Sequence, residues 1–159
     1  MLFLPAIFLI FLKIIMIECS CIPTSKQQPW MRIGDVWYTK LDAHLSWFDS
    51  MVACQKLEGG RSSLATVRNT SEQNAIQNHF SGYFWLGGFE IESTGLWFWW
   101  TLGKPEKIGT VYWNKGEPNN SKGNGEACLV ANWGVEKGWN DGVCTSTLSA
   151  LCELRCNST

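Results

Sequence analysis

The chain of 159 residues lacks several features that would point to common classes of function. It has no run of Lys or Arg and a formal net charge of −1, which argues against nucleic acid or an anionic membrane as its main partner. It contains no Cys-x-x-Cys pair, so nothing indicates a zinc or thiol-redox site. No spacing of Ser, His and Asp, or of Cys and His, indicates a nucleophilic enzyme.

The sequence also has no apolar run of the about 20 residues that a membrane-spanning helix needs. The longest such run, residues 1–17, is interrupted by Lys13 and is followed by small and polar residues. This pattern predicts a secretory signal peptide over residues 1–21, cleaved near 19–21, with an uncleaved signal anchor as the alternative. We therefore expect a secreted, extracellular protein, and the seven Cys agree with that compartment.

The rest of the chain has the length of one compact domain. Residues 22–29 are polar and flanked by prolines, which predicts a short tether. The domain is expected over residues 30–156, with a C-terminal tail at 157–159. The ten Trp provide large apolar side chains for its core.

Local patterns predict helices early in the domain and strands later. Residues 33–39 alternate as a first strand. Ser46 with Asp49 predicts the start of a helix that ends at Gly59–Gly60, and its apolar face comprises Trp47, Phe48, Met51, Val52 and Leu57. Thr70 with Gln73 predicts the start of a second helix that ends at Gly82. No helical period follows Tyr83, so the fold class is α+β.

The aromatic block Trp97-Phe98-Trp99-Trp100 is interpreted as core rather than as a surface for stacking a ligand. Trp85, Trp113 and Trp139 are expected to support the motifs beside them. His44 and His79 are lone histidines, and packing or surface positions are favoured over metal ligation.

Acidic and amide side chains cluster in the second half of the chain. Glu117 and Asn119 flank Pro118, Glu126 precedes Cys128, and Asn140 with Asp141 precedes Cys144. These residues provide three carboxylates and two carboxamides, the hard oxygen donors that calcium prefers. A cis peptide before Pro118 would direct its two neighbours toward one spot. The pattern predicts a Ca²⁺ site that is open on one side. A solvated turn, or a hydrolase that uses Glu117 and Asp141 as its carboxylate pair, are the alternatives.

Glu117-Pro118-Asn119, the Glu before Cys128, and Trp139-Asn140-Asp141 before Cys144 together resemble the C-type lectin carbohydrate-recognition domain of the Glu-Pro-Asn type. Trp85-Leu86-Gly87-Gly88 is similar to a core strand of that family, and secreted insect lectins are the most similar members. The resemblance runs from about Trp37 to Glu153. It implies an α+β fold with two helices, two small antiparallel sheets and a long calcium-binding loop. It also implies the disulfides Cys54–Cys152 and Cys128–Cys144, and leaves the pairing of Cys19, Cys21 and Cys156 open.

The resemblance further implies a calcium-dependent carbohydrate-binding protein, not an enzyme, that recognises vicinal hydroxyls of mannose, fucose or N-acetylglucosamine on glycans or microbial surfaces. Glu117 and Asn119 would select the diol. Glu126 and Asn140 would contact both the metal and the sugar. Asp141 would hold the metal, and all five residues would form the carbohydrate site. A lectin-like fold that binds protein without sugar is the alternative. Ala127 and Asn120 stand where the family often has acids, so a second calcium site is expected to be weak or absent.

Three Asn-x-Ser/Thr sequons begin at Asn69, Asn119 and Asn157. We expect a glycan at Asn69, which precedes a predicted helix, and consider Asn157 a second candidate. Asn119 cannot carry a glycan and also ligate calcium through its amide, so it is expected to be unmodified. Weak binding by a single site would favour a homo-oligomer.

Overall fold

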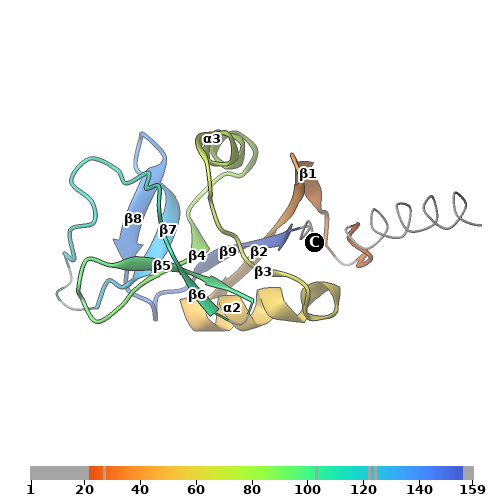
Figure 1. Cartoon of the computed structure of the whole chain (residues 1–159), viewed down its shortest axis with the longest axis horizontal. Coiled ribbons are helices and arrows are strands. Elements are labelled where there is room, and N and C mark those ends of the chain that lie inside the picture. Colours follow the sequence, from red (N-terminus) through yellow and green to blue (C-terminus); the bar gives the residue numbers. More distant parts are fainter. Residues whose placement is uncertain (1–21, 27, 103, 122, 124, 156–159) are drawn as a thin grey trace, which may run out of the picture.

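The computed structural model describes residues 22–26, 28–102, 104–121, 123 and 125–155 (Figure 1). The helices are α2 (Trp47–Lys56), the 3-10 helix η1 (Leu57–Gly60) and α3 (Thr70–His79). The strands are β1 (Met31–Ile33), β2 (Val36–Leu45), β3 (Ser63–Leu64), β4 (Phe84–Glu90), β5 (Trp97–Thr101), β6 (Lys104–Lys107), β7 (Cys128–Trp133), β8 (Gly138–Gly142) and β9 (Leu148–Arg155). The α+β class and the two α-helices expected from the sequence are confirmed within these residues.

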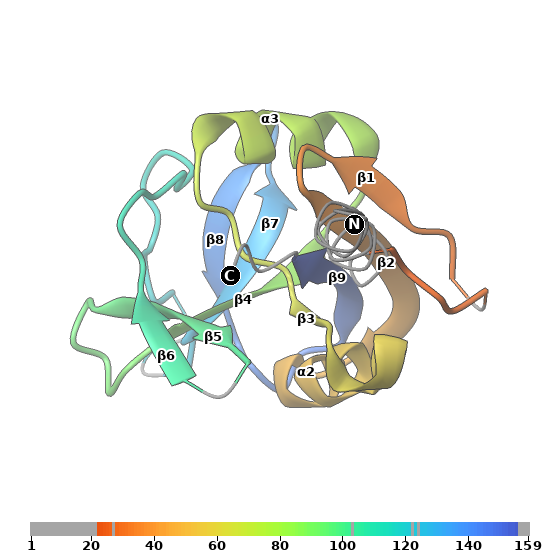
Figure 2. The same ribbon diagram turned by 45° about the vertical axis from the view of Figure 1, so that its right-hand side comes forward.

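The nine strands form one hydrogen-bonded sheet, in which the path β1-β2-β9-β4-β5-β6 carries β3 beside β9, and β7 with β8 beside β4. All pairs are antiparallel except β4 with β9, where Phe84 faces Ser149 and Trp85 faces Ala150. This parallel pair joins the antiparallel strands, for which the resemblance implied two small sheets, into one mixed sheet. Its residues are buried, so their backbone N–H and C=O groups need partners within the protein. Helices α2 and α3 lie on opposite sides of the central strands (Figure 2).

Helix α2 begins as predicted, because the Ser46 hydroxyl accepts a hydrogen bond from the Asp49 backbone N at 3.2 Å. Its buried residues are Trp47, Ser50, Met51 and Cys54. The prediction that Phe48 belongs to the apolar face is wrong, since its side chain is 62% exposed. Phe48 follows Trp47 directly, and neighbours in a helix point about 100° apart.

Helix α3 begins one residue earlier than predicted. Asn69, not Thr70, is the N-cap, and its Oδ1 accepts from the Glu72 backbone N at 2.9 Å. Gln73, which was expected to complete a cap, instead points into the core. The helix ends at His79, and Phe80 is already extended, so Gly82 does not determine the end. The His79 side chain is exposed.

The single strand predicted over residues 33–39 is a hairpin. Ile33 of β1 pairs with Val36 of β2 across a two-residue turn, and Gly34 in that turn has φ +59°. Glycine adopts this left-handed conformation without a steric penalty, which allows the chain to reverse there. Strand β2 then continues to Leu45 and pairs with β9 along most of its length.

The core has two apolar clusters that include most of the buried tryptophans. One cluster contains Tyr38, Trp97, Trp99 and Trp139, and the other contains Trp47 and Trp85. Within the predicted aromatic block, Trp97 and Trp99 are buried, as expected for core residues, while Phe98 and Trp100 are half-buried. Trp85 and Trp139 have no exposed surface.

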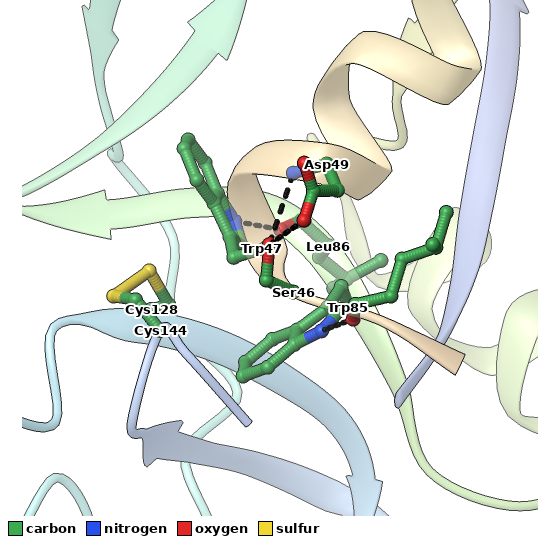
Figure 3. The surroundings of a disulfide bond; sticks show 8 residues. Ser46, Trp47, Asp49, Trp85, Leu86, Cys128 and Cys144 are labelled. Carbon is green, nitrogen blue, oxygen red and sulfur yellow. Dashed lines mark hydrogen bonds between the residues drawn. A yellow bond between two sulfur atoms is a disulfide. The ribbon is translucent and has the colours of Figure 1, made fainter. Parts of the chain in front are cut away.

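Two disulfides cross-link the domain, Cys54–Cys152 and Cys128–Cys144, which are the pairs that the resemblance implied. The first joins α2 to β9 across 98 residues of sequence, a loop for which the chain-entropy estimate is about 4–5 kcal/mol of stabilisation. The second lies beside Trp47 and Trp85 (Figure 3). The Trp47 backbone N also donates to the Cys144 carbonyl at 3.0 Å, so the start of α2 is linked to the end of the β7–β8 segment.

The Glu58 carboxylate binds the segment before β1, and Trp30 of that segment packs against the second core cluster. The backbone N atoms of Thr24 and Ser25 donate to the two oxygens of Glu58 at 2.7 and 2.9 Å. The predicted signal peptide, the cysteines 19, 21 and 156, the Asn157 sequon and the C-terminal tail lie outside the described residues. Among the residues described, no helix has the length and apolar character needed to cross a membrane.

Candidate metal centre

The structure brings the predicted ligand segments together. The Glu117–Pro118 peptide is cis. The turn that follows lies over β8, where the backbone N atoms of Asn119 and Asn120 donate to the two carboxylate oxygens of Asp141 at 3.1 and 2.6 Å. The Asp141 side chain is almost fully buried, with 1% of the residue exposed. Its carboxylate is therefore positioned directly beneath the Glu-Pro-Asn turn.

Ser121 joins two more of the predicted residues. Its backbone N donates to Asn119 Oδ1 at 2.8 Å, and its hydroxyl donates to Glu126 Oε2 at 3.1 Å. Glu126 is buried and lies two residues before the start of β7. No predicted ligand motif included Ser121, although it is the third residue of the Asn119 sequon.

Asn140 completes the set from within β8. It pairs with Val130 of β7, and the next residue, Asp141, pairs with Leu129. The Asn140 side chain is buried, and its Nδ2 donates to the Asp141 backbone carbonyl. All five predicted residues thus lie in one region, contributed by the turn around Pro118, the segment just before β7 and β8 itself.

The electrostatics of this region disfavour its negative charges. The pKa of Glu117 is raised, mainly by burial and then by a hydrogen bond to Asp141 and by the charges of Asp141 and Glu126. Its Oε2 atom is buried without a hydrogen-bond partner, as is Oδ1 of Asn120. Unpartnered buried oxygens beside like charges are stabilised by a cation.

The donor set fits a hard cation, because every proposed ligand atom is an oxygen. As they are arranged, no three His, Cys, Asp or Glu side chains in the described part of the chain converge closely enough to hold a metal ion. Two of the five proposed ligands, Asn119 and Asn140, are amides, which can bind calcium through their oxygens but do not belong to these four residue types. The Asn140 Nδ2 donates to the Asp141 carbonyl, which leaves the amide oxygen as the atom that Asn140 would offer to calcium.

Two residues that support the site were not identified from the sequence. Gln73 Oε1 accepts from the Trp139 indole at 2.9 Å, so α3 holds the residue next to Asn140. Asn114 binds the β7–β8 hairpin through its side-chain amide. Neither lies in a recognisable motif, because each acts through a contact with residues distant along the chain.

Comparison with known proteins decides the family. The model of the lectin C-type domain matches residues 43–154, which is most of the chain. The protein belongs to the C-type lectin domain family. The fold expected from the resemblance is therefore the fold that the family and the structure share. Membership in a family of binding domains also favours a binding protein over a hydrolase.

Two relatives illustrate the similarity. Ladderlectin of Oncorhynchus mykiss is 32% identical over 118 residues, which cover 70% of this chain and 58% of ladderlectin. The C-type lectin mannose-binding isoform of Oxyuranus scutellatus is 30% identical over 148 residues, covering 87% of this chain and 85% of that protein. Other matches span about half of a longer protein: 58% of ladderlectin and 44% of the CD209 antigen-like protein A of Mus musculus.

A solved structure extends the comparison to another activity. The Ca²⁺-free form of a Ca²⁺-dependent type II antifreeze protein is 27% identical, with a TM-score of 0.68, and the match covers 83% of this chain and 98% of that one. The fold therefore occurs in a protein described as an antifreeze protein rather than as a sugar-binding one, and the assignment of a ligand depends on the site.

Proposed function

We propose that this protein is a secreted, calcium-dependent carbohydrate-binding protein that recognises vicinal hydroxyls of mannose, fucose or N-acetylglucosamine. The main support is the placement of the Asp141 carboxylate beneath Asn119 and Asn120, with the unpartnered Oε2 of Glu117 in the same acidic cluster. A relative described as a mannose-binding lectin supports the sugar class.

In this proposal, Glu117, Asn119, Glu126, Asn140 and Asp141 hold one Ca²⁺. Bound calcium, which accepts up to eight oxygens, supplies open positions for a neighbouring pair of sugar hydroxyls. The protein residues determine the orientation of that pair. The Glu117 carboxylate accepts a hydrogen bond from one hydroxyl, and the Asn119 amide donates one to the other. The order of acceptor and donor along the turn then favours mannose-type over galactose-type diols.

Calorimetric titration of the oxidised protein with calcium chloride tests the metal site directly. We expect saturable uptake of one ion, and acidification should release it because protons compete for the carboxylates. Absence of calcium uptake at neutral pH would refute the proposal.

The double variant Glu117→Gln with Asn119→Asp tests sugar selection. It exchanges the acceptor and the donor while keeping two oxygen donors for the metal. We expect the wild type to bind mannose-agarose and to elute with EDTA, and the variant to prefer galactose-agarose. Equal retention of the variant on both resins would contradict the proposed role of these residues.

We also propose that Asn69 carries an N-linked glycan. Asn69 is exposed, and its Oδ1 caps α3, which leaves the attachment atom Nδ2 outside that hydrogen bond. Asn119 is proposed to be unmodified. Peptide mass spectrometry of the secreted protein distinguishes the two sites.

Protein binding without sugar is the second candidate, and one surface feature favours it. The rings of Tyr83 and Trp133 pack with centroids 4.7 Å apart at a tilt of 40° and are 49% and 37% exposed, and Val135, two residues after Trp133, is fully exposed. Exposed apolar groups of this kind often mark contacts with another protein. Binding of a partner that persists in EDTA would favour this candidate.

A further inference from the structure

Asn114 connects the two halves of the candidate site. Its backbone N donates to the Trp139 carbonyl at 2.9 Å, and its backbone carbonyl accepts from the Glu117 N at 3.0 Å. Its side-chain Oδ1 accepts from the Gly138 N at 3.1 Å, and its Nδ2 donates to the Trp133 carbonyl. One residue thus binds the end of β7, the start of β8 and the start of the Glu117 turn.

The hairpin is shaped to admit this amide. A Cβ at Gly138 would lie 2.6 Å from Asn114 Oδ1 and 2.8 Å from its backbone N. A Cβ at Gly134, which has φ +67°, would lie 2.9 Å from Nδ2. Real Cβ atoms do not approach so closely, so both hairpin positions next to the amide require glycine. The space beside the two glycines therefore fits a side chain of the size of Asn that both accepts and donates a hydrogen bond.

The path from Asn114 to the ligands is short on both sides. Glu117 follows it by three residues, and Asn140 follows Gly138 by two. The hydrogen bonds to the Asp141 carboxylate, itself a proposed metal ligand, also join these segments, as does the bond from the Trp139 backbone N to the Tyr112 carbonyl at 2.8 Å. The Asn114 contacts involve none of the five proposed ligand side chains. These contacts can therefore hold the two segments in register both before and after a metal binds.

We infer that Asn114 is a positioning residue that aligns the Glu117 turn with β8 for calcium and sugar binding. The metal part of this inference rests on the proposed function. The alignment itself concerns the metal-free protein and can be tested there.

The decisive comparison is between Asn114→Ala and Gln77→Ala. Gln77 holds the same hairpin, since its Nε2 donates to the Lys137 carbonyl at 2.6 Å, and among the described residues no hydrogen bond joins it to the Glu117 turn. Amide hydrogen exchange of the calcium-free proteins should be about 10-fold faster or more at Glu117, Asn119 and Asn120 in Asn114→Ala, because opening of this region becomes easier. These three amides should remain within about twofold of wild type in Gln77→Ala.

Calcium titration of the same variants measures the effect on the metal. Asn114→Ala should raise the Kd for calcium about 10-fold or more, as expected for a residue that orients ligands, and Gln77→Ala should leave it within about twofold. Gly138→Ala keeps Asn114 but displaces it and should reproduce the effect. If Asn114→Ala fails to fold, Asn114→Asp replaces it, since this variant keeps the acceptor and loses the donor to Trp133.

Equal exchange rates and equal calcium affinities in the Asn114 and Gln77 variants would overturn the inference. Exchange that accelerates only in the Asn114 variants supports it. That result would stand even if the wild type took up no calcium, an outcome that would refute the proposed function instead.

Discussion

Two buried acidic clusters in this protein are neutralised in different ways. In the first, which we name the Arg155 cluster, the Arg155 guanidinium donates to Glu72 at 3.0 Å and to Glu153 at 3.1 Å. In the second, the site cluster, Glu117, Glu126 and Asp141 lie together, and no Lys or Arg of the described residues forms an ion pair with Glu117 or Asp141. The first contains its own cation, and the second is suited to a cation from solution.

The directions of the pKa shifts agree with this difference. Burial raises the pKa of Glu153, and the charge of Arg155 opposes the rise. For Glu117, burial raises the pKa and the neighbouring carboxylates raise it further. The pKa of a third acid, Glu58, is lowered. Burial acts to raise it, but hydrogen bonds from Thr24 and Ser25 and the charge of Arg61 outweigh that effect. Groups of the protein thus favour the charged forms of Glu153 and Glu58, whereas the neighbouring carboxylates disfavour the charged form of Glu117.

The largest expected effect follows from removing the internal cation. Arg155→Met leaves Glu153 buried without its partner and should reduce the free energy of unfolding by about 3–5 kcal/mol at neutral pH. The loss should shrink on acidification, because Glu153 can then take up a proton. Urea denaturation measures it.

Arg68→Met serves as the control for that variant. Arg68 pairs with Glu106 on the surface, where the two side chains are 37% and 45% exposed. Loss of an exposed pair costs about 0–1 kcal/mol. Similar losses in both variants would show that burial does not distinguish the two ion pairs.

The second prediction concerns the site cluster. Glu117→Gln should leave the calcium-free protein as stable as wild type or more stable, because it removes one of three like charges. It should weaken calcium binding by at least about 100-fold, beyond the range expected for residues that only orient ligands. Denaturation without calcium and calorimetry with calcium measure the two effects. A loss of calcium-free stability comparable with that of Arg155→Met would remove the contrast between the clusters.

The smallest effect is expected at Glu58. A carboxyl whose folded-state pKa is lowered contributes stability above its unfolded pKa of about 4.3, and this contribution is lost as the pH falls through the folded value. Glu58→Gln should therefore cost about 1 kcal/mol at pH 7. The unfolding curves of variant and wild type should converge below pH 4. A constant difference from pH 7 to pH 3 would exclude an ionic contribution.

Several features of the fold followed from local sequence, and others did not. Ser46 with Asp49 correctly indicated the start of α2, because a cap is a contact between near neighbours. The start of α3 was placed one residue late, since both Asn69 and Thr70 can cap a helix. Gln73 cannot complete a cap for Thr70, because its side chain turns inward and accepts a hydrogen bond from the Trp139 indole. This contact joins residues 66 positions apart.

The sequence by itself determined the chemistry of this protein: oxygen donors beside Pro118 and before two cysteines, and enough tryptophan to build a core. Residue types and short spacings carry that information. Only the tertiary structure decided which groups complete one another, such as Asn114 with Gly138 and Arg155 with Glu72. These hydrogen bonds join segments that are distant along the chain, and their partners are selected by the packing of strands and helices rather than by any local pattern.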